Sequence, residues 1–194
     1  MKVAVLALQG AFIEHEQVLQ QLGVETIEIR QLSDWQRFCP DSNQTSGGLG
    51  LILPGGESTV QQRLLHQLGL FEPIRQAIAS GLPVFGTCAG MILLSEGYLG
   101  TMAVRVRRNA YGRQLGSFHT VSSVSGIGSD VPMTFIRAPY IDEVLSSEVE
   151  VLAQVDGHIV AVRQGCQLAT AFHPELDSDL RIHKHFLESA KPYV

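Results

Sequence analysis

Cysteine is scarce in this chain of 194 residues, which contains only Cys39, Cys88 and Cys166. None of the three belongs to a CxxC pair, so the ligand spacing of a structural zinc site is missing. Three scattered thiols do not form the paired framework of a disulfide-rich domain, and an odd number suits a reducing compartment. We therefore expect a cytoplasmic protein without a structural metal.

Positive charge and long apolar runs are also in short supply. Lys and Arg number 14 against 19 Asp and Glu, and the net charge of −5 argues against a dedicated nucleic-acid binder, which needs a basic surface. The longest uncharged stretch, 77–95, is interrupted by Pro83 and three glycines, a pattern that predicts a strand, a turn and a helix instead of a membrane span. The apolar start, 1–8, is too short for a signal peptide, so no membrane association is expected.

Apolar residues, in contrast, make up 45 % of the chain, enough to bury the core of one domain spanning residues 1–194. In the first half, short apolar strands alternate with amphipathic helices. Strands are expected at 2–8, 24–29, 49–53 and 83–86, and helices at 11–22, 59–79 with a break near Gly69, and 88–96. This alternation predicts an α/β fold with a parallel sheet between two layers of helices.

The second half of the chain changes to a series of strand signals. Strands are expected at 101–106, 115–124, 134–136, 149–155, 159–163 and 168–172, which we interpret as antiparallel additions to the same sheet. Asp156-Gly157 and Gln164-Gly165 lie where tight hairpin turns are expected. A final helix is expected over 178–189, with Ser178 as its N-cap. The predicted architecture has three layers, a mostly parallel central sheet and antiparallel strands in the C-terminal half.

The most informative motif is G-x-C-x-G at residues 86–90, the cysteine form of the nucleophile elbow. In this motif the nucleophile, here Cys88, lies on a sharp turn from a strand into a helix, so the residues two positions away, Gly86 and Gly90, must be small. The start of a helix favours the thiolate form of the sulfur. The alternative is an inert buried cysteine, which is common for a lone thiol, but the two glycines after an apolar strand favour a nucleophile.

A cysteine nucleophile needs a base, and His173 with Glu175 supplies a candidate pair. Their spacing of two residues places both side chains on the same side of extended backbone, and Pro174 keeps His173 out of the helical conformation. Glu175 can then bind one imidazole nitrogen and leave the other facing the sulfur. The alternative is a surface His and Glu at a strand end, but the order Cys, His, Glu favours a triad.

A third element is the Gly55-Gly56 loop after the strand at 49–53. Backbone N–H groups of such a loop can point at an anion, so an N–H of Gly56 and that of Ala89 are candidates for an oxyanion hole. The alternative is a plain turn followed by a helix that Ser58 caps. A phosphate-binding loop fits poorly, because the G-x-x-x-x-G-K-[ST] pattern is absent.

Arginine is concentrated after the elbow, and histidine is scattered. Arg105, Arg107, Arg108 and Arg113 fall within nine residues, and Arg137 lies further on. They form either a solvated strand edge or a clamp that holds a substrate carboxylate through forked hydrogen bonds. The sequence names no partner for His15, His66 or His158. The run from His183 to His185 is interpreted as a solvated helix face, because i and i+2 do not converge on one metal.

Together these residues resemble the class I (triad) glutamine amidotransferases. Longer strings narrow the resemblance to the family of glutaminase subunits of pyridoxal 5′-phosphate synthase, and they cover nearly the whole chain. The strings are 8–12 with Glu14-His15, 53–59, 108–114, 135–139 and 171–176. Other amidotransferases of this class tend to carry Leu-Gly after the cysteine, where this chain has Ala89-Gly90.

The resemblance implies a flavodoxin-like fold, Cys88 as nucleophile and His173 with Glu175 as its relay. It implies glutamine contacts from Gly56, Glu57, Ser58, Arg108, Ile136 and Arg137, and no metal or organic cofactor. It further implies that L-glutamine is hydrolysed to glutamate and ammonia, and that the ammonia passes to a synthase subunit with a (β/α)₈ barrel in a hetero-oligomeric complex. The isolated chain is then expected to be weakly active.

The chain departs from the family pattern in three places. His119 stands where the family usually has Glu, the segment 97–104 is shortened and the segment 37–50 is extended. These differences bear on local geometry and partner contacts. Two alternative functions remain open from the residues: a γ-glutamyl hydrolase or cysteine peptidase-like relative, which also uses an elbow cysteine, and an inactive scaffold that binds and regulates a synthase.

Overall fold

The computed structural model describes residues 2–39, 49–108 and 117–190, arranged as strands and short helices. The strands are β1 (Lys2–Leu6), β2 (Glu25–Ile29), β3 (Leu49–Leu53), β4 (Val84–Thr87), β5 (Val104–Arg107), β6 (Ser117–Val124), β7 (Gly128–Ile136), β8 (Tyr140–Val144), β9 (Val149–Val155), β10 (His158–Gln164) and β11 (Gln167–Thr170). The helices are α1 (Phe12–Gln21), α2 (Leu32–Phe38), α3 (Ser58–Gln67), α4 (Phe71–Ala79), α5 (Ala89–Leu94), the single 3₁₀ turn η1 (Pro174–Leu176) and α6 (Arg181–Ser189).

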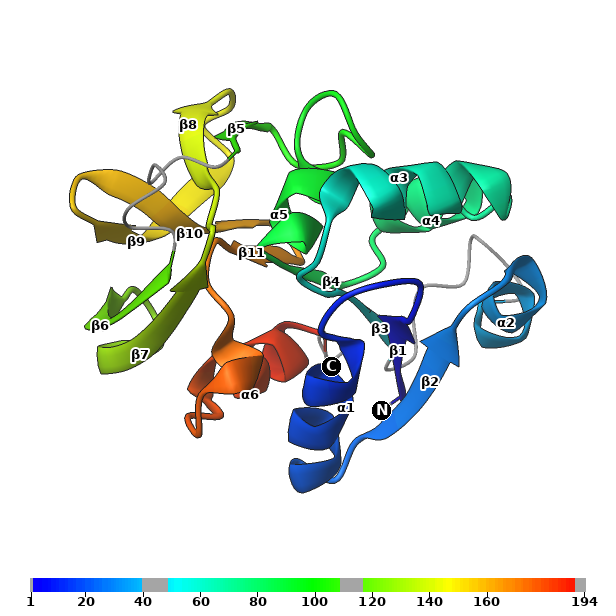
Figure 1. Ribbon diagram of the computed structural model, residues 1–194, viewed down its shortest axis with the longest axis horizontal. Coiled ribbons are helices and arrows are strands. Elements are labelled where there is room, and N and C mark those ends of the chain that lie inside the picture. Colours follow the sequence, from blue (N-terminus) through cyan, green and yellow to red (C-terminus); the bar gives the residue numbers. More distant parts are fainter. Residues whose placement is uncertain (1, 40–48, 109–116, 191–194) are drawn as a thin grey trace.

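A nine-stranded sheet runs through the molecule in the order β2-β1-β3-β4-β11-β10-β8-β5, with β9 paired to β10 (Figure 1). The strands from β2 to β11 in this order are parallel, and β10, β9, β8 and β5 are joined by antiparallel pairing. Strands β6 and β7 form a separate two-stranded sheet. The predicted combination of a mostly parallel sheet with antiparallel strands in the C-terminal half is confirmed.

Helices cover both faces of the central sheet, as the alternation of strands and helices predicts. Figure 1 shows α3, α4 and α5 on one side of the sheet and α1 and α6 on the other, while α2 lies by the β2 edge. Because both faces are covered, the central strands are mostly apolar along their whole length and do not alternate with polar residues. The core residues of β1 and β4, among them Val3, Leu6 and Phe85, are fully buried.

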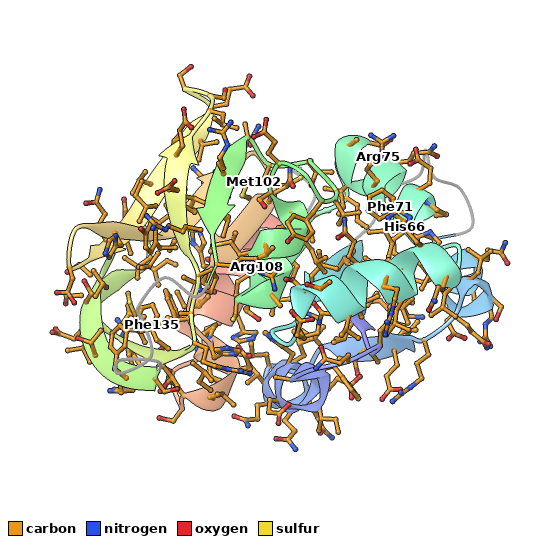
Figure 2. The ribbon with its side chains drawn as sticks, turned by 45° about the horizontal axis from the view of Figure 1, so that its top comes forward. His66, Phe71, Arg75, Met102, Arg108 and Phe135 are labelled. Atoms are coloured by element: carbon orange, nitrogen blue, oxygen red, sulfur yellow. The ribbon has the colours of Figure 1, made fainter. Side chains whose placement is uncertain are left out.

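The helical stretch after β3 breaks where the sequence predicts. Helix α3 ends at Gln67 and α4 begins at Phe71, and Gly69 between them has a φ of +69°, a conformation that glycine adopts without a Cβ penalty. His66 stacks on Phe71 across this break, with ring centroids 4.0 Å apart (Figure 2). This histidine, for which the sequence names no partner, therefore packs against the next helix.

Several sequence expectations are wrong in detail. Helix α2 and strand β8 were not expected, and β6 and β7 pair with each other outside the main sheet. Strand β11 is antiparallel to β10, as expected, but on its other side it runs parallel to β4, which was not expected. The last helix begins at Arg181, not Ser178, and its N-cap Leu180 makes no side-chain cap hydrogen bond. The turns at Asp156-Gly157 and after Gln164 are confirmed, since each joins two paired antiparallel strands.

Part of the expected β6 strand, residues 115 and 116, lies outside the described residues, as does most of the segment 37–50. Among the residues that are described, no helix is long and apolar enough to cross a membrane.

Candidate active site

Three neighbouring parallel strands deliver the three predicted site segments to one edge of the sheet. The Gly55-Gly56 loop follows β3, Cys88 follows β4 and His173 follows β11, and β4 lies between the other two strands. The carboxyl ends of parallel strands are where open α/β sheets place their ligands. Segments that are far apart in the sequence are therefore brought together by strand order.

Cys88 lies on a strained turn between β4 and α5. Its φ of 48° and ψ of −100° are unusual for a residue with a Cβ, and such a conformation costs on the order of 1–3 kcal/mol. Its backbone N–H donates to the carbonyl oxygen of Thr170 at 2.8 Å, which ties the turn to β11. The predicted elbow is present, and Cys88 is 7 % exposed.

The two glycines of the motif are required by close packing. A Cβ on Gly86 would lie 2.7 Å from the carbonyl carbon and oxygen of Gly90, and a Cβ on Gly90 would lie 1.9 Å from the carbonyl oxygen of Leu53. Both distances are far shorter than any real Cβ contact. The absence of side chains here allows α5 to lie directly on β3 and β4.

His173 and Glu175 form the predicted pair. The Nδ1 atom of His173 lies 2.7 Å from Oε1 of Glu175, and both residues are 6 % exposed. The backbone N–H of His173 donates to the carbonyl oxygen of Thr134 in β7, and Pro174 begins the η1 turn that carries Glu175. This geometry fixes the imidazole by one nitrogen and leaves the other available to Cys88.

The electrostatics of the pair favour a charged imidazole. Burial acts to lower the pKa of His173, but its side-chain hydrogen bonds to Cys88 and Glu175 outweigh burial and raise that pKa to about 10. Burial raises the pKa of the Glu175 carboxyl, and the hydrogen bond from His173 opposes this rise. A proton held between the sulfur and the carboxylate is the arrangement that a cysteine nucleophile with a histidine partner requires.

The Gly55-Gly56 loop packs directly on the imidazole. A Cβ on Gly55 would lie 2.3 Å from Cε1 of His173, so this position accommodates only glycine while the ring stays where it is. The N–H of Gly55 donates to Oγ1 of Thr87 at 3.0 Å, and its carbonyl oxygen accepts from the N–H of Ala11 at 3.0 Å. The loop is thus anchored to β4 on one side and to the start of α1 on the other.

A cavity of about 170 Å³ opens next to the sulfur. All six predicted glutamine contacts line it together with Cys88: Gly56, Glu57, Ser58, Arg108, Ile136 and Arg137. Ser58 is 2 % exposed, and its Oγ has no hydrogen-bond partner among the described residues. Ala89, the second predicted oxyanion residue, directly follows Cys88 as the first residue of α5 but does not line this cavity.

Glu57 and Arg108 face each other on the cavity wall. Nη2 of Arg108 donates to Oε1 of Glu57 at 3.0 Å, and Figure 2 shows Arg108 between α5 and the start of α3. Glu57 is also the N-cap of α3, since its carboxylate accepts from the N–H groups of Thr59 and Val60. The alternative in which Ser58 caps this helix is therefore wrong: Ser58 is its first residue.

The remaining arginines divide into two groups. Arg137 has a φ of 44°, a second strained residue on the cavity wall. Arg105 pairs with Glu96 and Glu143, and Arg107 donates to the hydroxyl of Tyr140, both outside the cavity. These two arginines belong to a strand edge, whereas Arg108 and Arg137 belong to the site. Arg113 lies outside the described residues.

Comparison with known proteins decides the family. The SNO glutamine amidotransferase family matches residues 5–191 of the chain. The chain belongs to this family. A pyridoxal 5′-phosphate synthase subunit PdxT from Streptococcus pneumoniae is 54 % identical, with 98 % of each chain covered. The same-named subunit from Haemophilus influenzae is 50 % identical, covering 98 % of this chain and 99 % of that one.

Solved structures agree with this assignment. A crystal structure described as a glutamine amidotransferase matches with a TM-score of 0.85 at 42 % identity, covering 97 % of this amidotransferase and 98 % of that chain. A glutamine amidotransferase from Thermotoga maritima shares the fold with a TM-score of 0.60 at 14 % identity, covering 98 % of this chain and 90 % of that one. The predicted class I amidotransferase fold is confirmed.

Two buried histidines that lie beside the site of this amidotransferase were missed from the sequence. His15 and His183 are both 0 % exposed, and their rings meet with Nδ1 of His15 3.0 Å from Nε2 of His183. The interpretation of 183–185 as a solvated face is therefore wrong for His183. A signal was present: His15 lies three and four residues before the apolar Val18 and Leu19, on the same helix face.

Two further observations complete the surroundings of the site. His119, which is expected to depart from the family pattern, lies with Nε2 3.4 Å from Oδ1 of Asp177, and its side chain is 55 % exposed. Within the parts of the chain that are described, no group of three or more His, Cys, Asp or Glu side chains is arranged to hold a metal ion.

Proposed function

We propose that Cys88, His173 and Glu175 form the triad with which this glutamine amidotransferase hydrolyses L-glutamine to glutamate and ammonia. The observation that carries this proposal is the pairing of His173 with Glu175 at 2.7 Å while His173 also hydrogen-bonds the side chain of Cys88 on a strained elbow. Glu175 holds the imidazole by Nδ1, so that Nε2 is the nitrogen that hydrogen-bonds the sulfur of Cys88.

In the first half of the reaction, the Cys88 thiolate attacks the side-chain amide carbon of glutamine. The resulting tetrahedral intermediate collapses as His173 gives its proton to the departing nitrogen, which leaves as ammonia. A γ-glutamyl thioester remains on the sulfur. His173, now neutral, removes a proton from a water that attacks the thioester, and glutamate leaves as the thiolate and the imidazolium are restored.

The charged groups of the cavity match the free end of an amino acid. Glu57 and Arg108 carry opposite charges 3.0 Å apart, and Arg137 lies on the same wall. We assign the α-ammonium group of glutamine to Glu57 and its α-carboxylate to the two arginines. Gly56, Ile136 and the unpartnered hydroxyl of Ser58 complete the contacts.

We assign the oxyanion hole to the backbone N–H groups of Gly56 and Ala89. Gly56 lines the cavity beside Cys88, and Ala89 follows the nucleophile, the usual position for one of the two donors in an elbow. Such donors act on the charge that develops in the transition state, and each typically contributes roughly 10²- to 10³-fold to the rate.

We further propose that the ammonia is delivered to a synthase subunit that makes pyridoxal 5′-phosphate. The support is the name of the relatives, pyridoxal 5′-phosphate synthase subunit PdxT, at 50–54 % identity over nearly the full chain. The partner is proposed to be a (β/α)₈ barrel in a hetero-oligomeric complex. The chain is proposed to act in the cytoplasm as one domain, 1–194. The division into one domain is supported by the main sheet, which contains strands from both halves of the chain.

The test is a substrate comparison with the purified chain, alone and mixed with the synthase subunit. We expect glutamate release from L-glutamine in the mixture, weak release by the chain alone, and no turnover of γ-glutamyl peptides, folate polyglutamates or ordinary peptides.

Preferential cleavage of γ-glutamyl conjugates would replace the proposal with a γ-glutamyl hydrolase, and cleavage of ordinary peptides with a cysteine peptidase. Absence of all turnover in the mixture, with binding to the synthase subunit retained, would indicate a regulatory scaffold.

A further inference from the structure

A pair of buried histidines lies directly behind the proposed triad. His15, in α1, contacts His183 of α6 through Nδ1 at 3.0 Å. Its other nitrogen, Nε2, lies 3.1 Å from Oγ1 of Thr87 and 3.4 Å from Oε2 of Glu175. One imidazole therefore contacts the carboxylate of the triad and the residue that immediately precedes Cys88.

The second oxygen of Glu175 needs such a neighbour. Oε1 is used by His173, whereas Oε2 is buried and makes no hydrogen bond within the described part of the chain. A buried carboxylate oxygen without a donor is costly, and it leaves the carboxylate free to rotate about its last bond. His15 Nε2 is the nitrogen that faces it.

The surroundings decide where the histidine protons lie. Burial lowers the pKa of His183 to about 4 and the pKa of His15 well below its usual value, so both rings are neutral at pH 7 and each carries one N–H. Nδ1 of His183 is buried without a partner in the described part of the chain, and a proton placed there would be an unpaired donor. The proton of His183 therefore belongs on Nε2, where it is donated to Nδ1 of His15.

This assignment fixes the proton of His15 on Nε2. The N–H then donates to Oγ1 of Thr87 and directs its positive end toward Oε2 of Glu175. The opposite tautomer would aim a nitrogen lone pair at the carboxylate. Thr87 extends the contact further, because its Oγ1 also accepts the N–H of Gly55, whose Cα packs against the His173 ring.

Resting on the proposed function, we infer that His15 is a positioning residue of the triad: its Nε2–H orients Glu175, and through Glu175 the His173 imidazole. His15 does not line the cavity, and it acts on the reaction only through Glu175 and Thr87. A histidine that merely filled the core would have no reason to share one nitrogen between a triad carboxylate and the elbow.

The experiment compares two substitutions of His15 in the full chain mixed with the synthase subunit. His15→Gln retains an amide N–H at the position of Nε2, whereas His15→Asn reaches only as far as Nδ1 and leaves no N–H facing Oε2 of Glu175. We expect His15→Asn to lower kcat roughly 10- to 100-fold at an unchanged KM, since a misplaced catalytic group typically costs up to about 10²-fold. His15→Gln should remain within about threefold of the parent chain.

The pH profile separates positioning from simple packing. Three groups face His15: His183 from α6, Thr87 from β4 and Glu175 from the segment after β11. His173 lies behind Glu175, and Glu14, on the same helix as His15, acts electrostatically on Glu175. Loss of the N–H that faces Oε2 disfavours the charged carboxylate, so the acid limb of kcat/KM should move to higher pH in His15→Asn and stay in place in His15→Gln.

Phe186→Leu provides the packing control, because it loosens the buried face of α6 and leaves both His15 and His183 in place. It should lose stability in thermal unfolding while the acid limb stays in place. A folded His15→Asn enzyme with the parent kcat and pH profile would overturn the inference alone, whereas an inactive parent chain would overturn the proposed function.

A second measurement needs no variant. In the parent chain at pH 7, ¹⁵N shifts of the labelled histidine rings report which nitrogen of each ring carries the proton. We expect His15 to carry it on Nε2. A proton on Nδ1 of His15 would overturn the inference even if no His15 variant folds.

Discussion

At the residue scale, the site depends on a glycine that makes room for the imidazole of the proposed triad. Gly55 has no side chain, and a Cβ built on it would lie only 2.3 Å from Cε1 of His173. The same residue donates its N–H to Thr87 and accepts from Ala11, so the loop has little freedom to move away. The position of the imidazole is therefore set from two directions, by Glu175 and by Gly55.

Replacing Gly55 by Ala should displace the imidazole. We expect Gly55→Ala to lower kcat for glutamine roughly 10²-fold, because a misplacement of about 1 Å in a catalytic group is enough for such a loss. Steady-state kinetics with L-glutamine in the presence of the synthase subunit measure this change in kcat.

Gly157→Ala is the control, since a Cβ at this hairpin turn meets nothing within 4 Å. Its φ of +77° makes some loss of stability expected, but kcat should not change. Parent-like turnover by Gly55→Ala would show that the loop or the ring adapts, and that this contact does not set the geometry.

Sequence patterns revealed the proposed triad because each of its members lies in a short local motif. Cys88 has a glycine on either side at a fixed spacing, and His173 is separated from Glu175 by a proline. His15 and His183 carry no such pattern, because they are 168 residues apart and meet only when α1 and α6 pack on the same face of the sheet. Helical spacing placed His15 on an apolar face, but it could not indicate that His183 is its partner.

At the element scale, the site is held together by the close approach of α5 to β3 and β4. Gly90 touches the carbonyl group of Leu53, and Gly86 touches Gly90, so helix and strands are separated by backbone alone. This approach places Cys88 at the centre of the cluster formed by the ends of β3, β4 and β11. Backbone atoms of a strand shift far less readily than a side chain does.

Gly90→Ala should therefore disrupt the packing of α5. A Cβ 1.9 Å from the carbonyl oxygen of Leu53 cannot be accommodated without moving the helix, and overpacking of this kind costs on the order of 3 kcal/mol. For a protein of this size that loss corresponds to a fall in Tm of roughly 10 °C.

Calorimetry of Gly90→Ala beside Gly97→Ala makes the comparison, since a Cβ on Gly97 meets nothing within 4 Å, although its φ of +87° carries a strain of its own. We expect the larger fall in Tm for Gly90→Ala. Equal falls for the two variants would contradict the view that α5 rests directly on β3.

Strand directions were the least predictable feature of the elements. Strand β11 has four residues, all buried, and a run so short has the same apolar pattern whether its neighbour is parallel or antiparallel. The direction follows from the chain path, because β10 and β11 form a hairpin and β11 lies beside β4. This parallel pairing is what brings His173 to Cys88, so the detail that sequence could not supply is the one that assembles the site.

At the scale of the whole molecule, the two buried histidines make stability depend on pH. Burial lowers the pKa of His183 to about 4 and lowers that of His15, so both stay neutral in the folded chain where the unfolded chain binds protons. Below about pH 6.5 the unfolded state therefore binds more protons, and stability falls as the pH falls toward 4. His173 has a raised pKa and acts in the other window: its contribution is full below 6.5 and is lost as the pH rises through about 10.

Acidification from pH 7 to pH 5 should thus lower the free energy of unfolding by about 2 kcal/mol through His183 alone. Urea unfolding at the two pH values measures this loss. His183→Leu, although less stable at pH 7, should lose about 2 kcal/mol less on acidification than the parent chain does. The same loss in both proteins would show that His183 is not a neutral buried group.

The complete site draws on elements from both halves of the chain, since α1, β3, β4, α5, β7 and β11 each contribute a contact to Cys88, His173 or Glu175 or to the loop beside them. The proposed chemistry depends on one atom, the sulfur of Cys88. The most direct test is glutamate production from L-glutamine by Cys88→Ala in the presence of the synthase subunit, measured against the parent chain. The account predicts a fall of at least about 10³-fold with the fold and partner binding intact. Undiminished turnover by Cys88→Ala would contradict it.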